Sequence, residues 1–325
     1  EDDNSDPSDG SARVRVVHAA PDAPAVDVTA DGTETVLFDG PAFGDAAYTE
    51  VSAGEYTLQV RGDTESNDGD VVAESPIRLD DGNVYTVYAT GYLSPDDEDA
   101  DPAFDLTATT DLGEGGGLLG TANVRVAHAS PDAPNVDVYV DDGQVLSDVP
   151  FRAVSDYLAV PEGARSVRIT AAGDADTVAF DGEIELAARD YTVAAIGELE
   201  GEDTEFRPVV LEDDNSEVGG DQARLRVLHA SPDAPAVDVT AAGGDVVLFD
   251  GVPFGEAGYT EVKANDYTVQ IRGDTETDDG DVVADFDVSL NGGTAYTAFA
   301  VGYLSPDDEP VDEAFDLQVA QDASY

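Results

Sequence analysis

Polar and apolar residues alternate with a period of two through most of the chain. Near the N-terminus Val14 and Val16 alternate with Arg13 and Arg15, and the same alternation runs over residues 55–61. It predicts short strands with one buried face, separated by Asp-Gly, Gly-Asp and proline-containing turns. No segment with a helical period exceeds two turns. In the first third of the chain the expected strands lie near residues 12–18, 25–30, 34–38, 47–51, 55–61, 70–79, 83–90 and 103–109.

One string of residues occurs three times. The segment Arg-Val-Arg-Val-Val-His-Ala-Ala-Pro-Asp-Ala-Pro-Ala-Val-Asp-Val at 13–28 returns with few changes at 123–138 and 224–239. The spacing defines units of about 100 residues, a normal size for a β-sandwich. The first and third units match almost throughout, whereas the middle unit diverges after its opening motif and is shorter. The order of the units is therefore A-B-A.

These patterns predict an all-β chain of three tandem Ig-like, Greek-key antiparallel β-sandwich domains. Glycine-rich and acidic stretches between the units are expected to act as linkers. The predicted parts are an acidic N-terminal spacer at 1–11, domain 1 at 12–111, a glycine-rich linker at 112–120, divergent domain 2 at 121–211, an acidic linker at 212–221 and domain 3 at 222–325.

The net negative charge of the chain argues against two classes of binding partner, nucleic acid and anionic lipid. There are 72 acidic residues against 14 basic ones, which gives a net charge of −58. Such a surface repels nucleic acid and anionic lipid, both of which need Lys and Arg to neutralise phosphate. Lys263 is the only lysine. A surface rich in Asp and Glu and poor in Lys needs cations to screen it, so we expect a source organism that lives in multimolar salt. The alternative is a merely acidic extracellular protein. The hydrophobic share of 41% argues against disorder.

The N-terminus and the lack of a long apolar run predict a location outside the cell. The chain begins at Glu1 without a methionine, which we interpret as a mature product whose leader was removed. No apolar run reaches the roughly 20 residues needed to span a bilayer, so the chain itself is not expected to insert into a membrane. Cysteine is absent, which excludes disulfides and thiolate chemistry. We therefore expect a secreted, cell-surface protein.

The string His-Ala-Ser-Pro-Asp-Ala-Pro-x-Val-Asp-Val resembles the signature of the domain-of-unknown-function family numbered 4397. The resemblance covers all three units, and the first unit departs from it by having Ala20 where the others have Ser130 and Ser231. It implies a sandwich fold in secreted and envelope proteins of bacteria and haloarchaea, often in tandem. It implies no established activity.

The repeated histidine, serine and aspartate invite comparison with a hydrolase triad. A serine nucleophile needs a base within reach and an oxyanion hole, but Ala20 removes the hydroxyl from the first unit and no Gly-x-Ser-x-Gly elbow occurs. One histidine per domain also argues against zinc or copper. We expect a structural motif instead, in which the aspartates accept backbone N–H groups of the turn. Its residues are His18, Asp22, Asp27, His128, Asp132, Asp137, His229, Asp233 and Asp238.

Two acidic loops are candidates for Ca²⁺, which prefers carboxylate and carbonyl oxygens. Their spacing is not that of an EF-hand, and in so acidic a chain the alternative is diffuse screening by cations. No cofactor is therefore expected to be required, and Ca²⁺ is the one candidate. The candidate ligands are Asp63, Glu65, Asp68 and Asp70 in the first unit and Asp274, Glu276, Asp279 and Asp281 in the third.

The absence of a recognisable catalytic constellation predicts a non-enzymatic protein. Similar end domains favour a structural or adhesive subunit, assembled head-to-tail into a surface filament or stalk. Its partners would be further copies of itself or other surface components. The alternative is a ligand-binding module for a polysaccharide or a protein. In that reading, exposed tyrosines such as Tyr48, Tyr92, Tyr259 and Tyr303 would stack on sugars.

Overall fold

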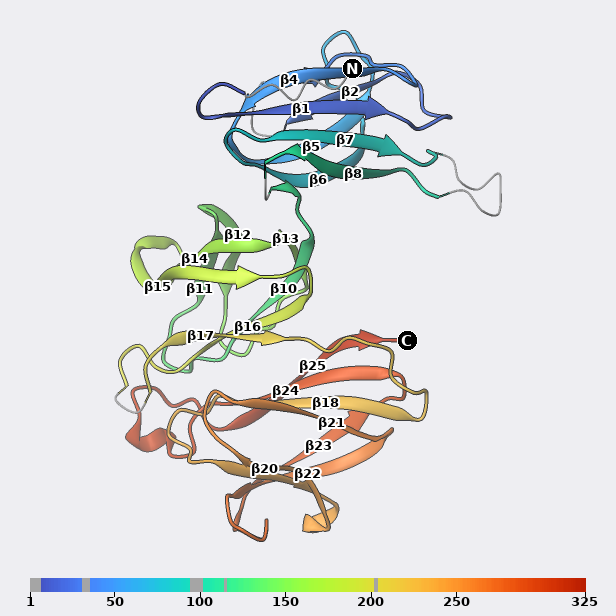
Figure 1. Ribbon diagram of the computed structural model, residues 1–325. Helices are drawn as coiled ribbons and strands as arrows, with labels where there is room; N and C mark the ends of the chain where they lie inside the picture. The colour runs from blue at the N-terminus through green and yellow to red at the C-terminus, as the bar shows by residue number, and fades with distance from the viewer. Residues whose placement is uncertain (1–6, 31–35, 94–101, 114–115, 202–203) are drawn as a thin grey trace. The chain divides into compact units, whose positions relative to one another are not determined.

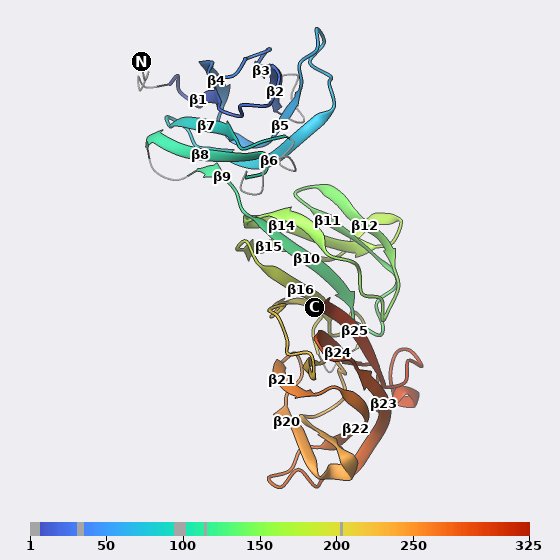
Figure 2. The same ribbon diagram turned by 90° about the vertical axis from the view of Figure 1, so that its right-hand side faces the viewer.

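The structure is a computed structural model that describes residues 7–30, 36–93, 102–113, 116–201 and 204–325. The chain forms two compact units, residues 1–120 and residues 121–325. Figures 1 and 2 show that each unit is built from strands packed as paired sheets. The first unit holds the first repeat, and the second unit holds the middle and third repeats.

The first unit is a sandwich of two sheets with the orders β4-β1-β7-β8 and β3-β2-β5-β6-β9. The strands expected from the alternating pattern are all observed, and their described ends lie within three residues of the predicted ones. Residues 34–35 of the third expected strand lie outside the described residues. The strands are β1 Ser11–His18, β2 Val26–Ala30, β3 Val36–Phe38, β4 Ala46–Ser52, β5 Gly54–Gly62, β6 Val71–Leu79, β7 Val84–Thr90, β8 Asp105–Leu112 and β9 Gly117–Leu118.

The second unit contains two further sandwiches with the same topology. The middle repeat has the sheets β13-β10-β16-β17 and β12-β11-β14-β15, and the third repeat has β21-β18-β24-β25 and β20-β19-β22-β23. Two short 3₁₀ turns, η2 Ala242–Gly244 and η3 Pro306–Asp308, lie in loops. The strands are β10 Thr121–His128, β11 Val136–Val140, β12 Gly143–Val149, β13 Leu158–Pro161, β14 Gly163–Ala171, β15 Asp174–Leu186, β16 Asp190–Ile196, β17 Arg207–Glu212, β18 Gln222–His229, β19 Val237–Ala241, β20 Val246–Val252, β21 Ala257–Lys263, β22 Asn265–Gly273, β23 Val282–Leu290, β24 Thr294–Val301 and β25 Asp316–Ser324.

The fold class predicted from the sequence, tandem β-sandwiches, is confirmed. The expectation that all strands pair antiparallel is wrong at one place in each repeat. The first strand pairs parallel with the seventh, as β1 with β7, β10 with β16 and β18 with β24. A parallel pair needs a long crossover, and here the chain passes through the opposite sheet between the two strands, which supplies it.

Each repeat has its own hydrophobic core between its two sheets. Strand β1 shows the pattern clearly, because Ala12, Val14 and Val16 are buried while Arg13 and Arg15 point outward. The corresponding inward positions of the other strands complete the core of the first repeat and the cores of the two repeats in the second unit. The outward positions of these same strands are therefore free to form other contacts.

Strands extend into both segments that the sequence indicates as linkers. Leu112 ends β8, and residues 117–118 form β9, so part of the glycine-rich stretch belongs to the first sandwich. In the acidic stretch Glu212 ends β17, and Asp213 and Val218 are buried. Part of each predicted linker therefore belongs to the folded sandwich before it, as a strand or as a buried residue. No helix among the described residues has the length and apolarity needed to cross a membrane.

Candidate functional site

The three histidines lie buried at the ends of the first strands of their repeats and have equivalent surroundings. Each ring is within 3.0 Å of a proline carbonyl six residues further on. Because a carbonyl only accepts, Nε2 carries the proton and donates it. Each ring also packs edge-on against a phenylalanine, with centroids 6.0–6.3 Å apart. The triples of histidine, proline and phenylalanine are His18, Pro24 and Phe43; His128, Pro134 and Phe151; and His229, Pro235 and Phe254.

The motif serines do not face their histidines with a hydroxyl. The Oγ atoms of Ser130 and Ser231 donate to the carbonyl oxygens of Gly197 and Gly302, each at 2.6 Å. In the third repeat it is the backbone N–H of Ser231 that donates to Nδ1 of His229, at 3.3 Å. Each hydroxyl proton is directed at a carbonyl, and the nearest carboxylate, that of Asp132 or Asp233, is further away at 3.3–3.4 Å. The histidine is therefore not placed as the base of a serine nucleophile.

The first aspartate of each motif accepts its backbone hydrogen bonds from a distant loop, whereas the sequence had suggested donors within its own turn. Its carboxylate accepts backbone N–H groups from the segment that follows the seventh strand of the repeat, about 70 residues along the chain, at 2.7–3.2 Å. Sequence spacing cannot reveal this because the loop arrives through the sheet topology. The donors are Leu93 for Asp22; Leu199, Glu200 and Gly201 for Asp132; and Leu304 and Ser305 for Asp233.

The second aspartate of each motif ties two further loops together. It is buried on the second strand, and its two oxygens accept one backbone N–H each, at 2.8–3.1 Å. A buried carboxylate is stable only when such donors replace its lost hydration. The donors are Gly40 and Thr64 for Asp27, Asp148 and Gly173 for Asp137, and Gly251 and Thr275 for Asp238.

The buried histidines make the stability of the second unit sensitive to mild acid. Burial lowers the pKa of His128 and of His229 below the ordinary value of 6.5. The unfolded chain then binds protons more readily than the folded one, so stability is full above about pH 6.5 and falls as the pH drops through the folded pKa. We expect thermal unfolding to shift to lower temperature between about pH 7 and pH 5, above the range in which ordinary carboxylates titrate. Replacing both histidines with glutamine should flatten this slope. An equal slope in the double variant would contradict the assignment.

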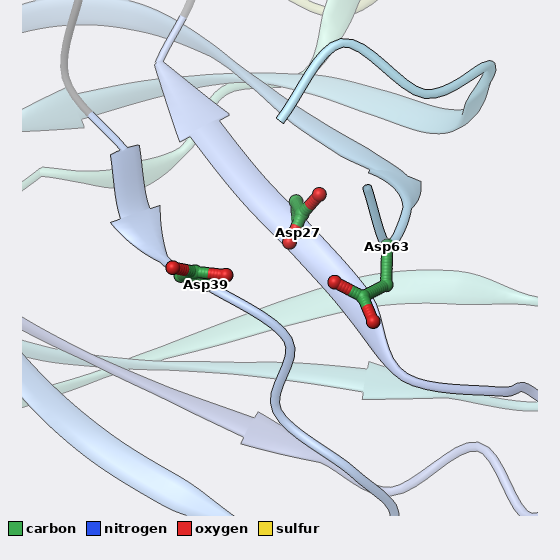
Figure 3. Close-up of side chains that lie close together, drawn as sticks. All are labelled: Asp27, Asp39 and Asp63. Atoms are coloured by element: carbon green, nitrogen blue, oxygen red, sulfur yellow. The ribbon is translucent and has the colours of Figure 1, made fainter. Parts of the chain in front are cut away.

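An acidic triad lies at one end of the first repeat (Figure 3). Asp27 comes from β2, Asp39 follows β3 and Asp63 follows β5, and one carboxylate oxygen from each lies within 4.8 Å of the others. The third repeat has a second triad, made by Asp238, Asp250 and Asp278. Three oxygens so close together repel one another unless a proton or a cation is shared among them. Carboxylates in this arrangement suit a hard cation such as Ca²⁺.

The triads contain only one of the ligands predicted from the sequence, Asp63. Asp68 instead accepts hydrogen bonds from Ser66 and Thr64 of its own loop, and Asp279 accepts one from Thr277. Among the described residues, Glu65, Asp70, Asp274, Glu276 and Asp281 join neither triad. The sequence pointed to one continuous loop, whereas the structure gathers carboxylates from three separate segments at one sandwich end.

Asp278 in the triad of the third repeat has unusual surroundings. Its pKa is raised by partial burial and by the neighbouring carboxylates of Asp250 and Asp238. Its Oδ1 atom is buried and has no hydrogen-bond partner. The matching position in the first repeat is Asn67, whose Oδ1 is likewise buried without a partner. An uncharged side chain therefore occupies this place in one repeat and a carboxylate in the other.

Calcium is expected to stabilise the end repeats through these triads. In moderate NaCl, millimolar Ca²⁺ should raise the midpoint of thermal unfolding by a few degrees, because it relieves the repulsion among three carboxylates. The double variant Asp39→Asn with Asp250→Asn should lose most of this shift. The matched control, Glu65→Gln with Glu276→Gln, alters exposed carboxylates outside the triads and should keep it. An equal Ca²⁺ shift in both double variants would indicate diffuse screening instead.

Two arginines lie between the middle and third repeats, inside the second unit. The side chains of Arg125 on β10 and Arg226 on β18 are each 2% exposed. Each bonds to a threonine of its own repeat and to one of the other. Each also forms its shortest ion pair with an aspartate of the other repeat. Arg125 Nη2 lies 2.6 Å from Asp322, and Arg226 Nη2 lies 2.7 Å from Asp213. The two threonines are Thr192 and Thr297.

The contact between these repeats has pseudo-two-fold symmetry. Every bond described for one arginine has a counterpart for the other, as in a two-fold interface where equivalent patches meet. Buried apolar residues of both repeats also form one shared cluster, and they too come in equivalent pairs. We call this surface the pairing face. It consists of Arg125, Ala127, Ala129, Thr192, Ala194, Ile196 and Asp213 in the middle repeat, and of Arg226, Leu228, Ala230, Thr297, Phe299, Val301 and Asp322 in the third.

The comparison with known protein families settles what the repeats are. One family, described as "Domain of unknown function (DUF4397)", matches residues 1–29, 12–114, 122–240 and 229–324. The chain belongs to the DUF4397 family. No curated protein matches the sequence. A solved structure, the Bacillus anthracis TIE protein, is 10% identical over 90% of this chain and 50% of that chain, with a TM-score of 0.19. This chain thus spans about half the length of that protein.

The pairing face was not anticipated from the sequence. Its arginines, Arg125 and Arg226, lie in the most repeated part of the DUF4397 motif, where the first repeat has Arg15. In the sequence of a strand they look like ordinary outward-facing residues. One signal was available, since arginine supplies nearly all the basic residues of a chain with one lysine. Arginine is the preferred cation for buried pairs because its planar fork satisfies several acceptors at once.

The tyrosines considered for sugar stacking have other contacts. Tyr303 is fully buried, and its hydroxyl donates to Glu198 at 2.9 Å, so its proposed exposure is wrong. Burial, first of all, and the bond to Glu198 raise its pKa. The rings of Tyr48 and Tyr259 lie under the guanidinium groups of Arg15 and Arg226, at 5.2 and 5.1 Å. Tyr92 is half-buried. None of the four presents a fully open ring.

Proposed function

We propose that this DUF4397 protein is a non-enzymatic structural or adhesive component of the cell surface of a halophilic archaeon, with repeats that serve as docking modules. The observation that carries the proposal is the pairing face, by which two repeats of one chain bind each other through a buried ionic and apolar contact. A β-sandwich that binds another β-sandwich through its outward face can serve as a docking module in a structural protein.

The chemistry of the repeated motif supports the same reading. The histidines donate to carbonyls, the serines donate to carbonyls, and the aspartates accept backbone N–H groups. Each polar group thereby closes a loop of its own repeat. The histidine and aspartate contacts recur in all three repeats, and the serine contact recurs in the middle and third. Groups used in this way are unavailable as a nucleophile or a general base.

The charge supports an extracellular, saline setting. With 72 acidic and 14 basic residues, the surface is stable only where cations screen its self-repulsion. A buried arginine–aspartate cluster is little affected by such screening, because salt weakens exposed pairs far more than buried ones. The contact between the repeats is therefore suited to multimolar salt.

The two-fold contact between the middle and third repeats restricts how a head-to-tail filament could form. A two-fold contact is closed, because both equivalent patches are used when two repeats meet. The pairing faces of the middle and third repeats are thus already occupied within the chain. Growth into a filament or stalk requires a different surface, such as the edge strands or the acidic sandwich ends.

Electron microscopy of the purified protein in multimolar NaCl tests the structural role. We expect extended assemblies, and their formation should respond to Ca²⁺ if the acidic sandwich ends take part. The control is the same preparation with a chelator. Monodisperse particles no larger than a dimer under both conditions would overturn the filament or stalk.

The second candidate is a ligand-binding module, and one groove favours it. In the middle repeat a groove of about 250 Å³ has Val178 and Leu199 on its walls, both more than 40% exposed, with Asp132 and Glu200 beside them. Apolar walls with a few polar groups are typical of small-ligand sites. Binding on a glycan array that is lost in Leu199→Asp would support this role, and no binding in multimolar salt would count against it.

A further inference from the structure

The second sheet of the middle repeat has an outward face that differs from its counterparts in the first and third repeats. This sheet, β12-β11-β14-β15, is the one that does not carry the pairing face (Figure 1). Three neighbouring strands each place one outward residue in a cross-strand row, and the rows of the three repeats correspond in register. The rows are Tyr139, Arg168 and Asp181 in the middle repeat, Thr29, Gln59 and Glu74 in the first, and Thr240, Gln270 and Asp285 in the third.

In the first and third repeats the polar groups of the row bond to one another. Each glutamine donates to the acidic residue beside it, at 3.2 Å in the first repeat and 2.7 Å in the third. The glutamine oxygen accepts in turn from an arginine two residues further along the same strand, Arg61 or Arg272. The donors and acceptors of these two rows are therefore used within the sheet.

The row of the middle repeat is built differently. Thr170 stands where the other repeats have Arg61 and Arg272, and Arg168 replaces the glutamine. The guanidinium of Arg168 lies over the ring of Tyr139, 4.9 Å from its centroid. Within the described ranges its side chain has no hydrogen bond and no ion pair. Because a cation–π contact uses none of the N–H groups, the donors of this arginine remain open to another molecule.

A tight turn adds a second carboxylate to the row. Asp141 and Asp142 join β11 to β12 with φ of +48° and +66°, whereas the third repeat uses residues 242–245 for this connection. A two-residue hairpin turn of this kind requires positive φ at both positions. The turn and the row together line a pocket of about 70 Å³, with half-buried and exposed side chains. The pocket is lined by Tyr139 and Arg168, which are half-buried, and by Asp142, Ser166 and Asp181, which are exposed.

We propose that this pocket binds a neutral sugar unit of a polysaccharide through hydrogen bonds to its hydroxyl groups. A hydroxyl both donates and accepts, and the pocket offers partners for both functions. The guanidinium of Arg168 donates, the carboxylates of Asp142 and Asp181 accept, and the hydroxyl of Ser166 does either. A simple anion would be repelled by the two carboxylates, and a simple cation by the guanidinium. An apolar ligand would cover these groups without replacing their hydration.

An uncharged ligand also suits the charge of the chain. A net charge of −58 repels acidic polysaccharides when little salt is present. In multimolar salt, attraction between exposed charges is screened, so a purely ionic site would lose its affinity. Hydrogen bonds to a neutral sugar depend little on such screening. The site therefore fits the saline setting proposed above.

This inference deepens the ligand-binding role given above as the second candidate, and it rests on that role. The pocket shares no lining residue with the groove at Leu199 or with the pairing face. Sugar binding here is therefore compatible with the contact between the middle and third repeats, and it can be separated by substitution from binding in the groove.

A glycan array tests the class of ligand. It should carry gluco-, manno- and galacto-oligosaccharides beside oligosaccharides of uronic acids, and the full chain is applied in multimolar NaCl. We expect binding to at least one neutral oligosaccharide and weaker or no binding to the acidic ones. Binding to none of the neutral oligosaccharides, or binding to the acidic ones at least as strong, would overturn the proposal.

A double variant tests the site. Tyr139→Thr with Arg168→Gln gives the middle repeat the row of the third repeat, so the fold should persist, and thermal unfolding checks this. Calorimetric titration with the neutral oligosaccharide bound on the array should show an affinity at least about tenfold lower, because the bonds from the guanidinium are lost. The matched control is Arg207→Gln, which removes the same charge from an exposed position on β17, in the other sheet of the same repeat. Equal affinities of the double variant and the control would overturn the assignment.

Leu199→Asp separates this pocket from the groove. We expect its affinity for the same oligosaccharide to equal that of the wild type. Binding that survives in the double variant and is lost in Leu199→Asp would place the sugar in the groove, which would overturn this inference and leave the ligand-binding role standing. A wild type that binds no oligosaccharide on the array would overturn both.

Discussion

Replacing Arg226 with methionine is expected to lower the free energy of unfolding of the second unit by about 3–5 kcal/mol. The substitution leaves the carboxylates of Asp213 and Asp322 buried with one guanidinium between them, where two were present. Thr192 and Thr297 each lose a donor as well. Methionine keeps much of the side-chain volume, so most of the loss comes from the uncompensated charge and not from a cavity.

The matched control is Arg15→Met in the first repeat. Arg15 bonds to a threonine and pairs with an aspartate within its own repeat, but its side chain is 16% exposed against 2% for Arg226, so its loss should cost less than that of Arg226. Urea unfolding of the full chain in multimolar NaCl, followed with a probe in each unit, measures the loss of free energy of unfolding in both variants. A cost for Arg226→Met no greater than that for Arg15→Met would show that the cluster between the repeats does not stabilise the fold.

The second large effect is expected at the buried aspartate that joins two loops. Asp137→Ala in the middle repeat should cost about 3 kcal/mol, because two charge-assisted bonds to Asp148 and Gly173 are lost and both N–H groups are left without their acceptor. Asp238→Ala in the third repeat removes the equivalent bonds to Gly251 and Thr275. It also relieves repulsion in the triad, so it should cost less than Asp137→Ala in the absence of Ca²⁺.

Hydrogen exchange at the four donor amides provides the direct measurement. Their exchange should accelerate in the alanine variants, and an Asn variant at either position should have an intermediate effect because its one carbonyl oxygen keeps one acceptor. In the presence of Ca²⁺ the cost of Asp238→Ala should rise toward that of Asp137→Ala, because the wild type then gains stability at a triad that the Asp238→Ala variant has lost. Costs below about 0.5 kcal/mol for both alanine variants would contradict the role assigned to these residues.

Local patterns allowed the strands to be predicted, because burial alternates residue by residue along each of them. Val14 and Val16 lie inward as their spacing indicates, and His128 and His229 each donate to a proline carbonyl of their own repeat. What could not be predicted depends on residues far apart in the sequence. The parallel pairing of β1 with β7 is an example, since both partners look like ordinary strands.

The candidate cation site illustrates the same limit. Asp63, Glu65, Asp68 and Asp70 are adjacent in sequence, but adjacent residues of a turn point in different directions, and only Asp63 turns toward Asp27. The other members of the triads come from strand ends that the fold brings together. Arg125 was missed for a related reason. An outward residue on a strand is read as solvent-exposed unless a second sandwich is known to cover it.

The central claim is that the middle and third repeats are coupled through the pairing face, and hydrogen exchange across that contact tests it most directly. In the full chain carrying Arg226→Met, a substitution in the third repeat, amide exchange should accelerate in β10 and β16 of the middle repeat, while β1 and β7 remain unchanged. Faster exchange confined to β18 and β24, with β10 and β16 protected as in the wild type, would contradict the account.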